Sequence, residues 1–143
     1  MDDYGRRIVV DMPFERAVMA VSRALHEENF HIIGRFDVRD HLKLTLGHEF
    51  RQYMLLQACS SQAMLDVLLE DLAAGATLPV TVAVYELADG ETAIVAGEPM
   101  GAVASDLAWR AALPALASIV DRESRRLARA LDRVPRVSTA TAA

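Results

Sequence analysis

A single cysteine at the entrance to a helix-like segment is the residue with the clearest potential for chemistry. Cys59 lies in the stretch LQACSSQAM, Leu56–Met64, where an apolar run meets two serines. A helix N-terminus favours the reactive thiolate form of a cysteine. A nucleophile also needs a base nearby, and His31, His41 and His48 are the candidate partners. Free cysteine is, however, among the most buried residue types, so we expect Cys59 to be a buried, inert thiol.

The histidines could instead bind a metal ion. His41 and His48, with Glu49 beside the second, are seven positions apart, a spacing that would align them on a continuous helix. Gly47 is expected to end that helix, and no H-E-x-x-H pattern is present. We therefore interpret these residues as surface groups of a connecting segment, and predict neither a metal site nor a cofactor.

Two aspartates are candidates for acid–base work. Asp37 follows a predicted strand, and Asp71 lies near the end of a predicted helix. Each also suits a structural role, because Asp37 can cap a short helix that begins near Arg39, and Asp71 can shape the turn toward Gly75. The glycine-rich phosphate-binding patterns are absent. No catalytic residue is assigned on this basis, and the residues favour a protein that is not an enzyme without deciding the matter.

The charge distribution argues against nucleic acid as a binding partner. The chain has 15 basic and 20 acidic residues, a net charge of −5 at neutral pH. No Lys, Arg or His occurs between Arg51 and Arg110, whereas the segment from Asp121 onward is rich in arginine. A nucleic-acid binder needs a positive footprint, which half of this chain lacks. No stretch is apolar enough to span a membrane, and the opening MDDYGRR lacks a signal-peptide layout, so we expect a cytoplasmic protein.

The order of predicted elements indicates a single α+β domain. We expect residues 1–134 to form this domain and residues 135–143 to form a flexible tail. Helical periodicity and strand alternation predict β-α-β-(α)-β-α-β-β-α, an antiparallel sheet of about five strands with helices mainly on one face and a C-terminal helix. The order resembles in part that of ferredoxin-like domains. The predicted segments are Arg6–Met12, Pro13–Asn29, Phe30–Val38, Arg39–Gly47, Gln52–Cys59, Ser61–Gly75, Leu78–Leu87, Glu91–Gly97 and 106–134. Helical spacing predicts buried faces on three of these segments, formed by Phe14, Ala17, Val18, Val21, Ala24 and Leu25; by Met64, Val67, Leu68 and Leu72; and by Leu113, Leu116, Ala117, Val120, Leu127 and Leu131.

Alternation along the strands assigns side chains to the two faces of this sheet. Val80, Val82 and Val84 are expected on the face that the helices cover, as are Ile32, Phe36 and Val38, and Met54, Leu56 and Ala58. The second face is then semi-apolar, and we expect a second subunit, the C-terminal helix or a small ligand to cover it. The ligand-binding residues predicted for this face are Tyr53, Gln57, Cys59, Tyr85 and Asp37.

Three segments together resemble a known family. They are EENFHIIGRFDV, TLGHEFRQYMLLQACSSQAM and EDLAAGATLPVTVAVYELADGETAIVAGEP. In order and spacing they resemble the bacterial and archaeal family called domain of unknown function 302, over about residues 6–100. The family pattern runs E-x-G-F, I-D, K-L-G, A-C-N-P and D-x-x-x-G-L-L-L-P-C-N-V, followed by a strand, a hairpin and a closing proline. The matching positions are Asp37, Leu46, Gly47, Ala58, Cys59, Asp71, Gly75, Leu78, Pro79 and Pro99.

The departures from the family pattern matter as much as the matches. Asn29 replaces a glycine at the end of the first predicted helix, a position where asparagine also tolerates a left-handed backbone. Ser60 and Ser61 replace Asn-Pro, and either serine can still cap the helix that follows. Val80 stands where the family has its second cysteine. Any redox or metal function that needs both cysteines is therefore missing here. The resemblance implies an α+β fold and a homodimer, but no activity.

Three functions remain open at this stage. The first is a non-catalytic homodimeric module that binds a small apolar or amphipathic molecule on its sheet face. The second is a small enzyme or thiol-dependent protein that uses Cys59. The third is a protein-interaction unit that docks through its arginine-rich C-terminal helix.

Overall fold

One five-stranded antiparallel sheet forms the centre of the molecule. The computed structural model describes residues 4–137. The strands are β1 (Gly5–Val10), β2 (His31–Asp37), β3 (Tyr53–Cys59), β4 (Val80–Ala88) and β5 (Glu91–Gly97). Their order in the sheet is β1-β5-β4-β3-β2, and every neighbouring pair is antiparallel. The α+β class is confirmed. Because β1 and β2 lie at opposite edges with three strands between them, the likeness to ferredoxin-like domains is limited to the order of elements along the chain.

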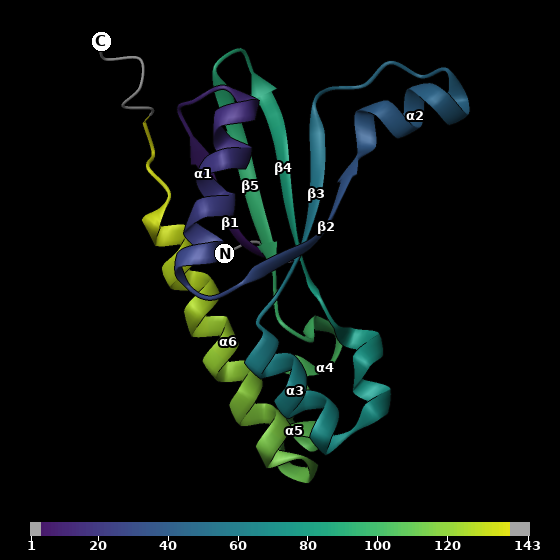
Figure 1. Cartoon of the computed structure of the whole chain (residues 1–143), viewed down its shortest axis with the longest axis vertical. Coiled ribbons are helices and arrows are strands. Elements are labelled where there is room, and N and C mark those ends of the chain that lie inside the picture. The colour runs from purple at the N-terminus through teal and green to yellow at the C-terminus, as the bar shows by residue number, and fades with distance from the viewer. Residues whose placement is uncertain (1–3, 138–143) are drawn as a thin grey trace.

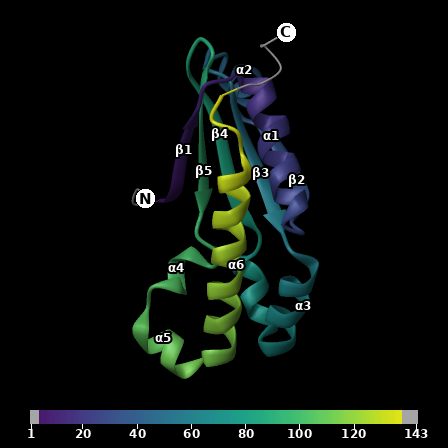
Figure 2. The same ribbon diagram turned by 90° about the vertical axis from the view of Figure 1, so that its left-hand side faces the viewer.

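Two long helices cover the same face of the sheet. These are α1 (Phe14–Glu27) and α6 (Pro114–Arg133). Figures 1 and 2 show both helices on one side of the strands, with α6 running beyond the end of the sheet. All six residues expected on the apolar face of α1 are buried. The C-terminal helix therefore does not cover the second sheet face.

The remaining helices are short. They are α2 (Val38–Leu46), α3 (Ser61–Glu70), the 3-10 helix η1 (Leu72–Thr77), α4 (Gly101–Ala104) and α5 (Leu107–Ala112). The lower half of α6 lies beside α3, α4 and α5 beyond the sheet (Figure 2), where Val67, Leu116 and Val120 belong to a second, smaller core. Among the described residues, no helix is long and apolar enough to cross a membrane.

The predicted capping residues occupy the positions expected for them. Asp37 caps α2, and its carboxylate accepts a hydrogen bond from the backbone N–H of Asp40 at 2.9 Å. Ser60 caps α3 by accepting from the N–H of Ala63 at 3.3 Å. Asn29 adopts a left-handed backbone, with φ of 65°, directly after the end of α1. These two N-caps and the left-handed asparagine fix where the helices begin and end, as the residue types predict.

Two details differ from the sequence-based expectation. The helix expected to run to Gly75 ends at Glu70, because Asp71 begins η1 by accepting a hydrogen bond from the N–H of Ala73 at 3.0 Å. Leu72, expected in the core, is consequently 82% exposed. The C-terminal segment divides at Pro114, which begins α6, and this break leaves Leu113 39% exposed rather than buried.

The arginines of α6 bind acidic residues of other helices in the same chain. Glu28, buried at the end of α1, accepts hydrogen bonds from Arg129 (3.2 Å) and Arg133 (3.4 Å). Arg122 pairs with Asp66 of α3 at 3.2 Å. After α6, the N–H of Asp11 donates to the carbonyl of Arg136. Residues 138–143 of the predicted tail lie outside the described residues. These arginines of α6 are thus paired within the chain, with acidic residues of α1 and α3.

The packing of α6 predicts a contrast between two leucine-to-alanine variants. Leu131 is fully buried, and Leu131→Ala should lower the free energy of unfolding by about 2–5 kcal/mol, since it opens a cavity in the main core. The control, Leu72→Ala, should change it by less than about 0.5 kcal/mol, because Leu72 is exposed. Urea denaturation measures both values, and equal losses would contradict this packing.

Candidate functional site

The sheet face opposite α1 and α6 carries a pair of stacked tyrosines. Tyr53 of β3 and Tyr85 of β4 are direct cross-strand partners. Their ring centroids are 5.1 Å apart, and the ring planes are inclined by only 9°. Small residues of the central strands surround them, which leaves a hollow of about 430 Å³. Its lining residues are Tyr4, Tyr53, Thr81, Ala83, Tyr85, Val95 and Gly97. Two residues predicted to bind a ligand therefore lie together on one concave surface.

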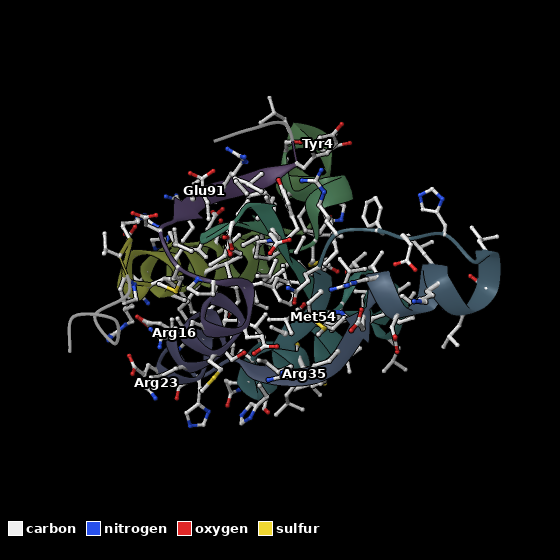
Figure 3. All side chains as sticks on the ribbon, turned by 90° about the horizontal axis from the view of Figure 1, so that it is seen from above. Tyr4, Arg16, Arg23, Arg35, Met54 and Glu91 are labelled. Atoms are coloured by element: carbon white, nitrogen blue, oxygen red, sulfur yellow. The ribbon has the colours of Figure 1, made fainter. Side chains whose placement is uncertain are left out.

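This hollow is open to solvent and has no charged side chain in its lining. Figure 3 places Tyr4 on one side of the sheet and Arg16 and Arg23 of α1 on the other, so that the hollow faces away from the helices. Burial, followed by the influence of Tyr85, raises the pKa of the Tyr53 phenol above its ordinary value. Tyr53 is consequently a neutral hydroxyl at physiological pH, able to donate and accept hydrogen bonds.

A second hollow of about 270 Å³ adjoins the first, because Thr81 lines both. It contains Gln57, the third predicted residue, together with Arg35, Phe36 and Leu55. Phe36 was predicted to lie on the face that the helices cover, and this prediction is wrong. A register shift between Ile32 and Gly34 places Phe36 opposite Leu55, on the open face. An extra residue in a strand exchanges the two faces for every residue that follows.

The other two predicted residues lie elsewhere. Asp37 lines neither hollow, and the role that the structure gives its carboxylate is to cap α2. Cys59 lies at the far end of β3, 6% exposed, in a separate small cavity where the sheet meets α3 and α6. The cavity lining includes Ser60 and Val80. A cysteine at position 80, as in the family pattern, would therefore share this cavity with Cys59.

The environment of Cys59 favours the neutral thiol. Burial, and in second place the nearby Glu123, raises the pKa of the Cys59 thiol above its ordinary value. These two effects outweigh the helix N-terminus that follows. Its sulfur lies 3.6 Å from the carbonyl oxygen of Ser60. His31 is its cross-strand neighbour, but His31 is exposed and does not line the cavity.

The predicted surface group of histidines lies on and after α2. His41 packs its ring against Phe36, and His48 packs against Phe50, which in turn contacts Tyr53. Glu49 forms a 2.9 Å ion pair with Lys43, and this hydrogen bond is the main reason that the pKa of Glu49 is lowered. Within residues 4–137, no group of three or more His, Cys, Asp or Glu side chains is arranged to hold a metal ion.

Tyr4 and Glu123 are two of the lining residues that sequence reasoning did not assign to a site. Tyr4 lines the larger hollow from just before β1, and no periodicity in the sequence assigns it to a sheet face. Glu123 lines the Cys59 cavity and is 5% exposed. One signal for Glu123 was available: it follows Val120 by three residues and precedes Leu127 by four, so it lies on the apolar stripe of α6.

The buried thiol predicts slow alkylation. In the folded protein, Cys59 should react with iodoacetamide far more slowly at pH 7.5 than in urea, because burial keeps it protonated and inaccessible. The pH of half-maximal reactivity should lie above the value of about 8.5 that is typical of a free thiol. Mass spectrometry of timed samples measures both quantities. Rapid labelling of the folded chain at neutral pH would restore Cys59 as a candidate nucleophile.

Comparison with known proteins agrees with the fold and with the resemblance. A family model described as "Domain of unknown function DUF302" matches residues 7–134, a span that extends through α6. The crystal structure of an uncharacterized conserved protein DUF302 from Bacillus stearothermophilus is 27% identical in sequence and superposes with a TM-score of 0.78. The match covers 93% of this chain and 99% of that chain. No curated protein matches. The chain belongs to the DUF302 family.

Proposed function

We propose that this protein is a non-catalytic homodimeric module that binds a small amphipathic molecule on its open sheet face. The observation that carries the proposal is the stacked pair of Tyr53 and Tyr85 above an uncovered hollow of about 430 Å³. Ligand pockets are commonly lined by apolar and aromatic groups with few polar ones, and their volumes run from about 300 to 1,000 Å³. We place the protein in the bacterial cytoplasm, where a lone free cysteine stays reduced.

The lining of the two hollows defines the chemistry of the ligand. The larger hollow offers aromatic rings, aliphatic walls and neutral hydroxyls, which suits a flat, uncharged ring system. The adjoining hollow offers the amide of Gln57 beside the apolar side chains of Phe36 and Leu55. A ligand that spans both would place its apolar ring on the tyrosines and a neutral polar group near the amide of Gln57.

The helix α2 supports the homodimer. It has no buried residue, and Leu44 and Leu46 are 82% and 74% exposed. A helix of nine residues is marginal without tertiary packing. Figures 1 and 3 show α2 standing away from the body of the molecule, on the opposite side from α6. We define α2 and the following segment to Phe50 as the α2 arm.

A second copy of the chain fits both unpartnered surfaces. In a twofold dimer, the α2 arm of each protomer would lie across the open sheet face of the other, and the two contacts would be identical. The ring contacts from His48 through Phe50 to Tyr53 already connect the arm to the stacked tyrosines. The ligand would then lie between the sheet face and the partner's arm.

The alternatives receive less support. A thiol-dependent enzyme would need an activated Cys59, whereas its pKa is raised and no histidine lines its cavity. An acidic partner for α6 would compete with Asp66, Glu27 and Glu28, which already pair with arginines of that helix.

A charge on the α2 arm should dissociate the dimer. Leu44→Asp should shift the protein from dimer to monomer in sedimentation velocity, because it places a carboxylate in the apolar contact. The matched control is Leu69→Asp, which changes a leucine that is 75% exposed on α3, and it should remain dimeric. If the unaltered chain were monomeric, or both variants stayed dimeric, the arm would not be the interface.

Loss of one stacked tyrosine should weaken ligand binding. With 1-naphthol as a flat amphipathic probe, Tyr85→Ala should bind about tenfold more weakly than the unaltered protein, since ring stacking contributes about 0.5–1.5 kcal/mol beyond area burial. Leu65→Ala, on exposed α3, should bind the probe normally. Calorimetric titration measures both affinities, with thermal unfolding as a check on folding. Equal affinities for the two variants would contradict the site.

A further inference from the structure

A row of small and polar residues crosses the open sheet face near the stacked tyrosines. It runs through the five strands as Gly5, Gly97, Thr81, Gln57 and Gly34. Gly5 is the cross-strand partner of Gly97, and Gln57 is that of both Thr81 and Gly34. The two hollows of this face meet in the row, at Thr81. Because glycines flank them, only Thr81 and Gln57 project from the row. We call this row and the two hollows the trough.

Thr81 and Gln57 can bind a ligand through hydrogen bonds. Both residues are exposed, and within residues 4–137 neither side chain is hydrogen-bonded to another residue. A glutamine amide offers a C=O acceptor and N–H donors, and a threonine hydroxyl can both donate and accept. The trough therefore presents neutral donors and acceptors on an accessible surface.

Gly34 determines where the amide of Gln57 lies. A Cβ atom added to Gly34 would lie 2.9 Å from Gln57 Oε1 and 3.8 Å from Gln57 Cδ. The amide is thus packed against the backbone of β2, in space that any other residue at position 34 would occupy. Gly34 is a positioning residue for this amide.

The charges around the trough favour a neutral ligand. Among the described lining residues, Arg35 alone is charged, and its cross-strand partner Leu56 is fully buried on the side of the helices. Figure 3 shows Arg35 on the side of the sheet that carries Arg16 and Arg23. A charged ligand group would therefore lose its hydration without gaining an opposite charge in the trough.

The spacing between the tyrosines and the polar row sets the length of the ligand. Tyr53 precedes Gln57 by four residues on β3, and Thr81 precedes Tyr85 by four residues on β4. The two rows are therefore about 13 Å apart, at about 3.3 Å per residue. Ala83 lies between them with a short side chain, which leaves room for a ring. A fused two-ring system that contacts the tyrosines reaches Gln57 with its far edge.

We propose that the trough binds a neutral, flat, two-ring molecule whose far edge carries an N–H next to a C=O, the pair of groups that lactams and carboxamides share. The rings contact Tyr85 and Ala83, and the amide edge of the ligand exchanges hydrogen bonds with the amide of Gln57 beside Thr81. This inference rests on the function proposed for the open sheet face and names the chemical class of its ligand.

Two isomeric probes test the amide edge with the full chain. 4-Methyl-2-quinolone has a free N–H beside its C=O, whereas N-methyl-2-quinolone has the same composition and no N–H. In NMR titrations of 15N-labelled protein, the side-chain amide of Gln57 reports on the site, and that of Gln62, exposed on α3, is the internal control. The 4-methyl isomer should bind about fivefold more tightly, because it makes a hydrogen bond that its isomer cannot make. It should shift the Gln57 signal and leave that of Gln62 in place.

Three variants locate the effect, with the backbone amide of Thr81 as the reporter. Gln57→Met removes the side-chain amide, so the two isomers should bind with equal affinity. Gly34→Ala adds a Cβ atom that displaces the amide of Gln57, which should remove most of the preference. The matched control, Gln62→Met, should keep the full preference, because the Gln62 side chain is hydrogen-bonded to Asp66 on α3. The unaltered protein decides the question even if a variant fails to fold.

The outcomes separate this inference from the function on which it rests. Equal binding of the two isomers, with 1-naphthol also bound, would overturn the amide edge and leave the sheet-face site in place. If neither isomer nor 1-naphthol binds, both proposals are wrong. A preference for the 4-methyl isomer that leaves the Gln57 signal unshifted, or that persists in Gln57→Met, would also overturn the inference.

Discussion

The packing of α1 and α6 on one face of the sheet is the interaction on which the rest of the structure depends. Fully buried residues of the helices and strands, such as Leu25, Val84 and Leu131, form the main core between these layers. Glu28 fixes the contact by accepting hydrogen bonds from two arginines of α6. Since α6 continues past the sheet, the same helix also organises α3, α4 and α5 around a second core.

Within residues 4–137, this one-sided arrangement leaves two surfaces that no other element covers. The opposite sheet face exposes its stacked tyrosines, and the α2 arm exposes its leucines. The proposed twofold dimer would cover both surfaces at once, with the projecting arm of one protomer on the concave sheet face of the other. The Cys59 cavity has another origin: it forms where the two cores meet, and its polar group comes from the stripe of α6.

The sequence predicted the elements well where local chemistry determines them. Alternating valines placed β4 and its buried face, and Asp37, Ser60 and Asn29 marked helix ends that the structure confirms. It failed where an effect is not local. The register shift in β2 moves Phe36 to the open face, and an aspartate cap ends α3 although its apolar periodicity continues.

The candidate site was predictable only in part, for a related reason. Strand alternation brought Tyr53 and Tyr85 to one face, because they belong to regular, paired segments of β3 and β4. The same alternation grouped Cys59 with them, but Cys59 lies at the end of β3 against a different layer. The position of Glu123 in the Cys59 cavity depends on contacts between α6 and elements more than twenty residues away, which no pattern along the chain encodes.

The proposed homodimer requires that the α2 arm of one chain and the open sheet face of the other cover each other. Hydroxyl-radical footprinting of the unaltered protein, above and below its dissociation concentration, tests this claim most directly. Association should protect Leu44 and Leu46 together with Tyr53 and Tyr85, while Leu65 and Leu69 of α3 stay reactive. Protection of α3, or of the arm with no change at the tyrosines, would contradict it.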